Sequence, residues 1–315
     1  MVRYFIERLI FLIISLFIVM SLIFILTRLA MLRIWAMPHP FIEDVHIAWQ
    51  DYLQYLNNIF TDWNWGETQD RLPVWAVVIE KLKVSLRYNL VALVIYFFGG
   101  VGLGIISAYY KNKFADNVVS FLSMLFNSIP GFVLIFFLII VFAYIVGWLP
   151  AQEPFANADL VRKLKGMIIP VIALSLAPMG RIAQLVRGEL IESVQSQQYL
   201  LLRAKGLTKK QAFLRHGVKD SMVVLLPEII PLFVYVINMS FVIEYTYNIN
   251  GIALLFVKSV ISFGGEYNAI RINTPIAVTI GTLLFAIILV FSLISDMTLA
   301  FIDPRIKIRS KKTRE

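Results

Sequence analysis

The chain has no cysteine among its 315 residues, and it has little charge. The missing thiols exclude disulfide bonds, thiolate catalysis and cysteine-ligated metals. There are only three histidines, His39, His46 and His216, so we do not expect a histidine-rich metal site. Charged residues make up 16% of the chain, against about 25% in an ordinary soluble domain. Apolar residues make up 59% and lie in long blocks, which excludes a soluble globular domain and a disordered chain.

Signatures of catalysis are also missing. The sequence contains no His-Glu-x-x-His motif, no phosphate loop ending in Gly-Lys-Ser/Thr and no Gly-x-Ser-x-Gly turn. The glycines between Gly99 and Gly104 resemble a nucleotide-binding fingerprint only in spacing, because they lie inside an apolar segment that no strand precedes. Gly100 and Gly104 fit better as a small-xxx-small face for close helix packing. We therefore expect neither an enzyme active site nor a metal or ATP site in this chain.

Long apolar runs dominate what remains. A helix needs about 20 apolar residues to cross the hydrocarbon layer, and six segments qualify. The first has 19 residues without charge; it is too long for a signal-peptide core, so we expect an uncleaved span. The third has 32 residues and contains Pro130-Gly131, which predicts a kink or a break. The six predicted spans are Leu9–Thr27, Asn89–Tyr110, Val118–Leu149, Met167–Val186, Met222–Ile243 and Ile276–Ser295.

The basic residues predict the orientation of these spans. With the N-terminus inside, the inner segments carry 18 Lys and Arg, whereas the outer segments, longer in total, carry 10. Positive charge concentrates on the cytoplasmic side of membrane proteins, so we expect both termini inside. The net charge of +9 is thereby assigned to a membrane surface rather than to nucleic acid. The inner segments are 1–8, 111–117, 181–221 and 303–315, and the outer ones are 32–88, 150–166 and 244–275.

A few polar residues interrupt the apolar spans. Glu228, Glu244 and Asp296 lie near span ends, where a carboxylate can reach interfacial water; we expect caps or interhelical ion pairs rather than a proton relay. Other polar residues are candidates for a translocation path, although they could equally hydrogen-bond to neighbouring helices. The Pro130-Gly131 pair could be a bend rather than a gate. The path candidates are Asn127, Ser128, Pro130, Asn238 and Ser240.

The segment 187–220, between the fourth and fifth spans, has the clearest local pattern. Residues 189–194 can extend the fourth span, and 198–205 predict a short helix that Gly206 would end. Thr208, with Gln211 three residues later, predicts a capping box that starts another helix.

We expect the short helix to lie between two longer ones and to present Tyr199, Leu202 and Arg203 outward. Such a knob would fit a groove on a soluble partner. An amphipathic loop at the lipid surface is an equally good interpretation of the spacing alone.

This loop resembles the signature of a known family. Gln198-Tyr199, Arg203-Ala-Lys-Gly-Leu207 and Arg215-His216, followed by Pro227, are similar to the pattern of inner-membrane permease subunits of dipeptide, oligopeptide and nickel ABC importers. The N-terminal segment and the long outer stretch after it resemble the B-type subunit of the permease pair. The resemblance covers essentially the whole chain. Further matching segments are Ser128-Ile-Pro130, Gly147-Trp-Leu-Pro150, Asp296 and Asp303-Pro-Arg305.

The resemblance implies an all-α, polytopic bundle of six transmembrane helices, similar to type I ABC importer permeases, with the N- and C-termini inside. It implies a multi-pass protein of the cytoplasmic membrane of a prokaryote. The expected segments are 1–31 with the first helix, 32–88 outside, 89–310 as the permease core with the coupling loop 187–220, and a basic tail 311–315.

The resemblance also implies partners. They are a second homologous permease, two cytoplasmic ATPases holding ATP and Mg²⁺, an extracytoplasmic substrate-binding protein, membrane lipid and a peptide substrate, but no nucleic acid. The chain itself would hold no cofactor and catalyse no reaction. Its short loop helix would sit in a groove of one ATPase and transmit closure of the ATPases to the spans. The coupling residues implied are Gln198, Tyr199, Leu202, Arg203, Ala204, Lys205, Gly206 and Leu207.

Other functions stay open at this point. A secondary transporter or channel would act without ATPases, but it needs coupling groups near the bilayer midplane or matching broken helices, and we see neither. An ABC importer of nickel or another small solute fits the same residues. An intramembrane enzyme is disfavoured, because no His, Cys or paired-Asp site is visible.

Overall fold

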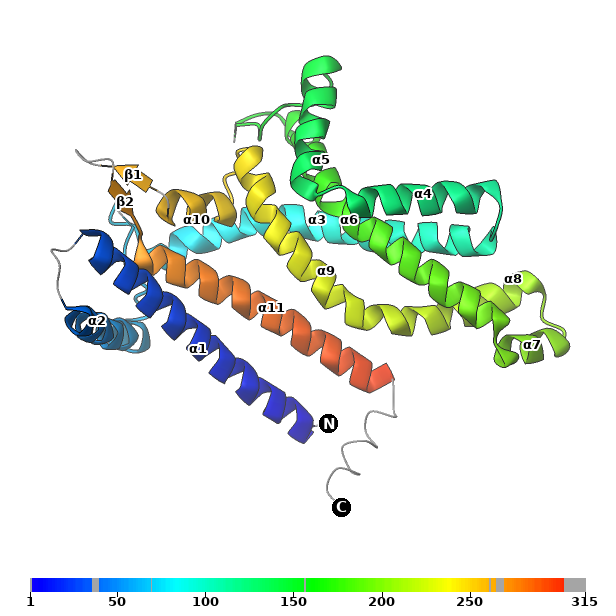
Figure 1. The fold of residues 1–315 in the computed structure, drawn as a ribbon, viewed down its shortest axis with the longest axis horizontal. Helices are drawn as coiled ribbons and strands as arrows, with labels where there is room; N and C mark the ends of the chain where they lie inside the picture. Colours follow the sequence, from blue (N-terminus) through cyan, green and yellow to red (C-terminus); the bar gives the residue numbers. More distant parts are fainter. Residues whose placement is uncertain are drawn as a thin grey trace. The chain divides into compact units, whose positions relative to one another are not determined.

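The structure is a computed structural model that describes residues 2–35, 40–68, 70–155, 157–260, 262–264 and 269–302. The regular secondary structure of the described chain is helical apart from two three-residue strands that pair antiparallel (Figure 1), so the all-α prediction is confirmed. Residues 37–39, the Asp303-Pro-Arg305 segment and the tail 311–315 lie outside the described residues.

The elements follow the chain in a simple order. They are α1 (Val2–Trp35), α2 (Phe41–Asp62), α3 (Val74–Tyr109), α4 (Phe114–Ser128), α5 (Gly131–Leu138), the π-helical turn η1 (Ile139–Ile145), α6 (Leu160–Gln195), α7 (Gln197–Ala204), α8 (Lys209–Ala212), the π-helical turn η2 (Phe213–Gly217), α9 (Val218–Thr246), α10 (Ile252–Val260), β1 (Ser262–Gly264), β2 (Ala269–Arg271) and α11 (Thr274–Ile302).

All six predicted spans have a counterpart. Five helices in the described chain are long and apolar enough to cross a membrane, and the bent pair of α4 with α5 and η1 provides a sixth if it counts as one span. The side of the membrane on which the termini lie stays a prediction. The five straight candidates are Phe5–Ile34, Val74–Tyr109, Leu160–Gln195, Pro227–Thr246 and Thr274–Thr298.

The third span is broken at the proline, as predicted. The two halves meet at an angle of 103°. Pro130 supplies no backbone N–H and forces the residue before it out of the helical region, and Ile129 accordingly has φ −87° and ψ 120°. A new helix then begins at Gly131. A Cβ built on Gly131 would lie 3.1 Å from Sδ of Met239, so the break packs against α9.

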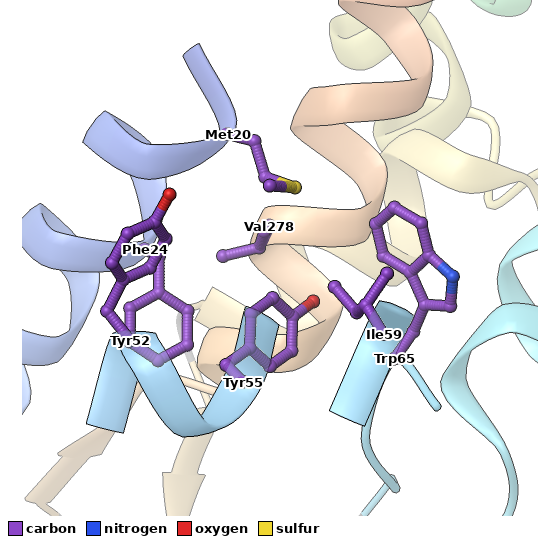
Figure 2. Close-up of a cluster of buried hydrophobic side chains, with 7 residues drawn as sticks. All are labelled: Met20, Phe24, Tyr52, Tyr55, Ile59, Trp65 and Val278. Atoms are coloured by element: carbon purple, nitrogen blue, oxygen red, sulfur yellow. The ribbon is translucent and has the colours of Figure 1, made fainter. Parts of the chain in front are cut away.

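The chain divides into two compact units, and membrane helices contribute to both. Unit 1 is Met1–Leu86 with Asn248–Leu293, and unit 2 is Arg87–Tyr247 with Ile294–Glu315. In unit 1, Tyr52, Tyr55 and Ile59 of α2 meet side chains of α1 and α11 in one buried cluster (Figure 2). The division into 1–31, 32–88 and 89–310 follows expected membrane topology, which this packing does not test.

Unit 2 is built around α6, which packs against α4 and α9. The predicted small-residue face of α3 also packs against α6. A Cβ on Gly100 would lie 2.7 Å from Cβ of Ile182, and one on Gly104 would lie 2.6 Å from Cβ of Val186. Real Cβ atoms do not approach so closely, so only glycine permits this helix spacing. The packing interpretation of the glycines is confirmed.

Candidate functional site

The loop between α6 and α9 begins without a spacer. α6 continues to Gln195, which confirms that the fourth span extends beyond the apolar run. Ser196 then caps α7: its Oγ accepts a hydrogen bond from the Tyr199 N–H at 3.2 Å and donates to the Ser193 carbonyl at 2.7 Å. A single residue therefore ends one helix and starts the next, which ties the direction of α7 to that of α6.

Gly206 and Thr208 form the turn that follows α7. Gly206 has φ +90°, a left-handed conformation that side chains other than glycine rarely adopt. No atom lies within 4 Å of a Cβ built there, so the requirement concerns the backbone and not space. Thr208 and Gln211 make both reciprocal bonds of a capping box, at 3.2 Å and 3.0 Å. The predicted helix end and the predicted capping box are both confirmed.

The face that α7 presents differs from the prediction. Tyr199 is only 7% exposed, and its hydroxyl donates to the carbonyl of Lys209 at 3.3 Å. The expectation that Tyr199 points outward is therefore wrong. The physical reason is that α8 packs against α7, which buries the Tyr199 ring in the loop.

Arg203 and Leu202 are closer to the expectation. Arg203 is exposed, but its guanidinium donates to the carbonyl of Leu207 at 2.6 Å and so supports the turn. Leu202 and Leu207 are half-buried, whereas Gln198, Ala204, Lys205 and Gly206 are exposed.

Sequence reasoning missed two exposed leucines on this helix. Leu200 is 63% exposed and Leu201 is 57% exposed. The signal that could have found them is two adjacent leucines in a helix of eight residues, because so short a helix packed on one side cannot bury both. The outer surface of α7 is thus apolar at its centre and basic at its C-terminal end.

An ion pair between the half-buried Arg187 and the buried Asp116 fixes the base of this loop, and sequence reasoning missed it as well. Arg187 donates from Nε to Oδ1 of Asp116 at 2.6 Å and from its second nitrogen to Oδ2 at 2.9 Å. Asp116 is 1% exposed and also accepts from the Ser107 hydroxyl and the Asn112 N–H. Bidentate, charge-assisted bonds of this kind are strong and directional. These bonds join α6, at Arg187, to the C-terminal end of α3 and the N-terminal end of α4.

A cavity of about 280 Å³ lies beside the loop. Its walls come from the α3–α4 connection, the end of α6, and the start of α8 and η2. Lys111, Lys113 and Lys209 are among its lining residues, which include no acidic side chain. Phe213 in η2 packs edge-on against Tyr109, with ring centroids 5.4 Å apart. This end of unit 2 is therefore basic and aromatic.

The path candidates lie on α4, α5 and α9. Asn127, Ser128, Pro130 and Asn238 are exposed in the described chain, and the break that follows Ser128 packs near Met239. The structure therefore brings the broken span close to the segment of α9 that contains Asn238. Ser240 does not join this exposed set, because it is buried and donates to Glu244 at 2.9 Å. A role in the path stays a prediction for all five candidates.

The carboxylates in the spans have structural partners. Glu228 of α9 lies 3.8 Å from a guanidinium nitrogen of Arg181 in α6, an interhelical ion pair and thus one of the two structural roles expected from the sequence. Glu244 accepts the bond from Ser240, and Asp296 also has an interaction partner.

Near the N-terminal end of α6, a polar cluster joins the connection before this helix to α3 and α9. Glu153 accepts a hydrogen bond from the Tyr88 hydroxyl at 2.9 Å and lies 3.4 Å from Arg87. The Tyr247 hydroxyl donates to the carbonyl of Pro150 at 2.6 Å. Arg87 is thereby explained as an ion-pair partner, a role that the sequence alone did not suggest.

Comparison with known proteins decides the class of the protein. The profile of a family described as "Binding-protein-dependent transport system inner membrane component" matches residues 100–308. The chain belongs to this family. It is therefore a multi-pass permease subunit of an ABC importer in the inner membrane, and the matched region of the permease includes α7, the capping residues and all five path candidates.

Two curated relatives illustrate how far the similarity extends. The permease is 29% identical over 320 residues to the dipeptide transport system permease protein DppB of Lactococcus lactis subsp. cremoris, an alignment that covers 98% of this chain and 100% of the relative. It is 33% identical over 231 residues to the oligopeptide transport system permease protein OppB of Escherichia coli, covering 73% of this chain and 71% of the relative.

A solved structure supports the fold. The MetNI methionine ABC transporter, in an inward-facing conformation, aligns with a TM-score of 0.55 at 16% identity. The alignment covers 73% of the permease and 97% of that chain. At this identity, the likeness concerns the fold alone.

Proposed function

We propose that this permease subunit carries short peptides across the cytoplasmic membrane. The observation that carries the proposal is the full-length similarity to a protein named as a dipeptide permease, together with a second relative named as an oligopeptide permease. In this assignment the chain catalyses no reaction and holds no cofactor. ATP and Mg²⁺ bind to two separate ATPase subunits, a second permease completes the path, and an extracytoplasmic binding protein delivers the peptide.

We further propose that α7 is the contact through which the ATPases drive the spans. Two features support this role. The helix is fixed at both ends by Ser196 and Gly206, and its outer surface offers Leu200 and Leu201 for an apolar groove. The Asp116–Arg187 pair connects its base to α3 and α4, so that a displacement of α7 would be passed to membrane helices rather than absorbed by a loose loop.

The orientation that accompanies this proposal places both termini and α7 in the cytoplasm. It rests on the distribution of Lys and Arg, of which 18 lie in the inner segments and 10 in the outer ones. The basic surroundings of the cavity beside Lys209 are consistent with that side of the membrane.

The experiment reconstitutes the complete importer and compares Gly206→Asp with the unchanged protein. A side chain at this backbone conformation is strained, and aspartate also adds a negative charge next to Lys205, at the basic end of α7. We therefore expect the turn after α7 to be weakened and ATP-driven uptake of a labelled tripeptide to fall several-fold. Gly188→Asp is the matched control, because Gly188 also has open space around it but no positive φ.

Two experimental outcomes would overturn the proposal. Normal uptake and normal association with the ATPases in Gly206→Asp would contradict the role of α7. Uptake of Ni²⁺ without uptake of any peptide by the unchanged complex would contradict the substrate class and leave the role of α7 intact.

A further inference from the structure

The helix α2 has an apolar face that no part of the described chain covers. Its buried face, with Tyr52, Tyr55 and Ile59, packs in the cluster of Figure 2. A second stripe recurs at intervals of three, four or seven residues and so lies along one side of the helix. Its members are exposed by 40–81%: Ile42, Val45, Trp49, Leu53 and Phe60.

A third side of α2 is polar. Gln50, Gln54 and Asn57 are exposed there, and the helical periodicity separates them from the apolar stripe. The helix therefore has one face for its own unit, one apolar face and one face for water. A helix of this kind, with aromatic residues on the apolar side, is typical of the boundary between headgroups and acyl chains.

Ion pairs fix the level of α2 relative to the first membrane helix. The charge-free run of α1 ends at Thr27. Beyond it, Arg28 lies 2.6 Å from Asp51 and Arg33 lies 2.9 Å from Asp44. Because charged residues mark the end of the hydrocarbon region, these pairs hold α2 where α1 leaves the membrane core.

The direction of α2 is that expected of a helix at the membrane surface. Figure 2 shows α2 lying across its neighbours, with Tyr52 near Phe24 of α1 and Tyr55 near Val278 of α11. In Figure 1, α2 is seen nearly end-on whereas α1 and α11 are seen from the side. A helix that crosses membrane-spanning helices at this level runs along the membrane surface.

Two further observations favour lipid over a protein partner. α1 itself exposes apolar side chains, including Leu22 at 54% and Leu26 at 63%, so the helix on which α2 packs is one that presents apolar surface to acyl chains. Trp63, directly after α2, is 58% exposed and packs edge-on against Trp65 and Trp75. Tryptophan is enriched at the interface of membranes with water.

We propose that α2 is an interfacial helix that lies in the headgroup region at the C-terminal end of α1, with the Ile42–Phe60 stripe turned toward the acyl chains. The ligand is the phospholipid surface. The helix anchors α1 and α11 at a fixed depth while other helices move. This inference does not depend on the substrate or on the role of α7.

The absence of native cysteine makes a direct test practical. Single spin labels are placed at Val45→Cys and Leu53→Cys on the stripe, and at Gln50→Cys and Gln54→Cys on the polar side as matched controls. Each variant is studied in the complete importer in vesicles of phosphatidylethanolamine and phosphatidylglycerol. We measure collisions of the label with oxygen, which concentrates in acyl chains, and with a water-soluble nickel chelate.

We expect the ratio of oxygen to nickel collisions to be several-fold higher at the stripe sites than at the polar sites. Equal access to the nickel chelate at all four sites would place the stripe in water and overturn the proposal. Loss of access to both probes at the stripe sites would show a protein partner instead and would overturn it too. Tripeptide uptake by the same vesicles is a separate readout, so failure of this inference is distinguishable from failure of the proposed function.

Discussion

Among single residues, Asp116 and Arg187 bear most on how the loop between α6 and α9 is held. The carboxylate is almost completely buried and receives five hydrogen bonds, two from Arg187 and one each from Ser107, Asn112 and Ser120. A buried charge without its partner is far more costly than a surface one, because the protein interior cannot replace the lost solvation.

We predict that Arg187→Ala destabilises the permease. Removing one partner of a fully buried ion pair costs about 3–5 kcal/mol. Because the Arg187 side chain is 31% exposed, the loss here should be smaller, but the buried Asp116 carboxylate would still lose its main partner. The variant should therefore unfold at lower temperature in detergent and accumulate less in the membrane. Arg162→Ala, an exposed arginine on the same helix, is the control. Equal melting temperatures for the two variants would show that the pair contributes nothing to stability.

The residues also show where sequence reasoning succeeds. Gly206 and the Thr208–Gln211 box were predictable, because each involves groups within a few positions along the chain. The Asp116–Arg187 pair joins residues 71 positions apart, and no local sequence pattern predicts it. Tyr199 was placed on the wrong side because its burial depends on α8, whose packing on α7 follows from a turn and not from helical periodicity.

At the scale of elements, close contacts set by glycine govern the packing of α3 on α6. At Gly104 an added Cβ would lie 2.6 Å from Val186 and 2.8 Å from the carbonyl oxygen of Ala183. Backbone atoms cannot rotate away as a side-chain tip can, so the helices would have to separate.

We predict that Gly104→Leu separates α3 from α6 and costs about 1–3 kcal/mol of stability, the range for overpacking a core. Gly102→Leu is the matched control, because nothing lies within 4 Å of its added Cβ. Thermal unfolding of both variants in detergent is the measurement. The packing account fails if the two substitutions lower the melting temperature equally.

Elements were otherwise well predicted. The break in the third span follows from Pro130 alone, and each of the six spans has a counterpart because an apolar run of this length has few alternatives. The three faces of α2 were not predicted. The search for apolar runs long enough to span a membrane passes over this 22-residue helix, because its apolar residues alternate with polar ones.

At the scale of the whole molecule, we propose a permease whose conformational changes are driven by separate ATPase subunits. The family is established by the match over residues 100–308. The partition into two units was not predictable from sequence, because α3 and α11 each contribute residues to both.

The measurement that tests this account most directly is cross-linking from α7 in the assembled importer. Leu201→Cys, in a chain without other cysteines, is labelled with a photoreactive maleimide and illuminated with and without ATP. Leu164→Cys is the control, since Leu164 is equally exposed, at 55%, but lies near the other end of α6. We predict cross-links from position 201 to an ATPase subunit, with a yield that changes with ATP, and none from position 164. An intact complex in which position 201 cross-links only to lipid would contradict the account.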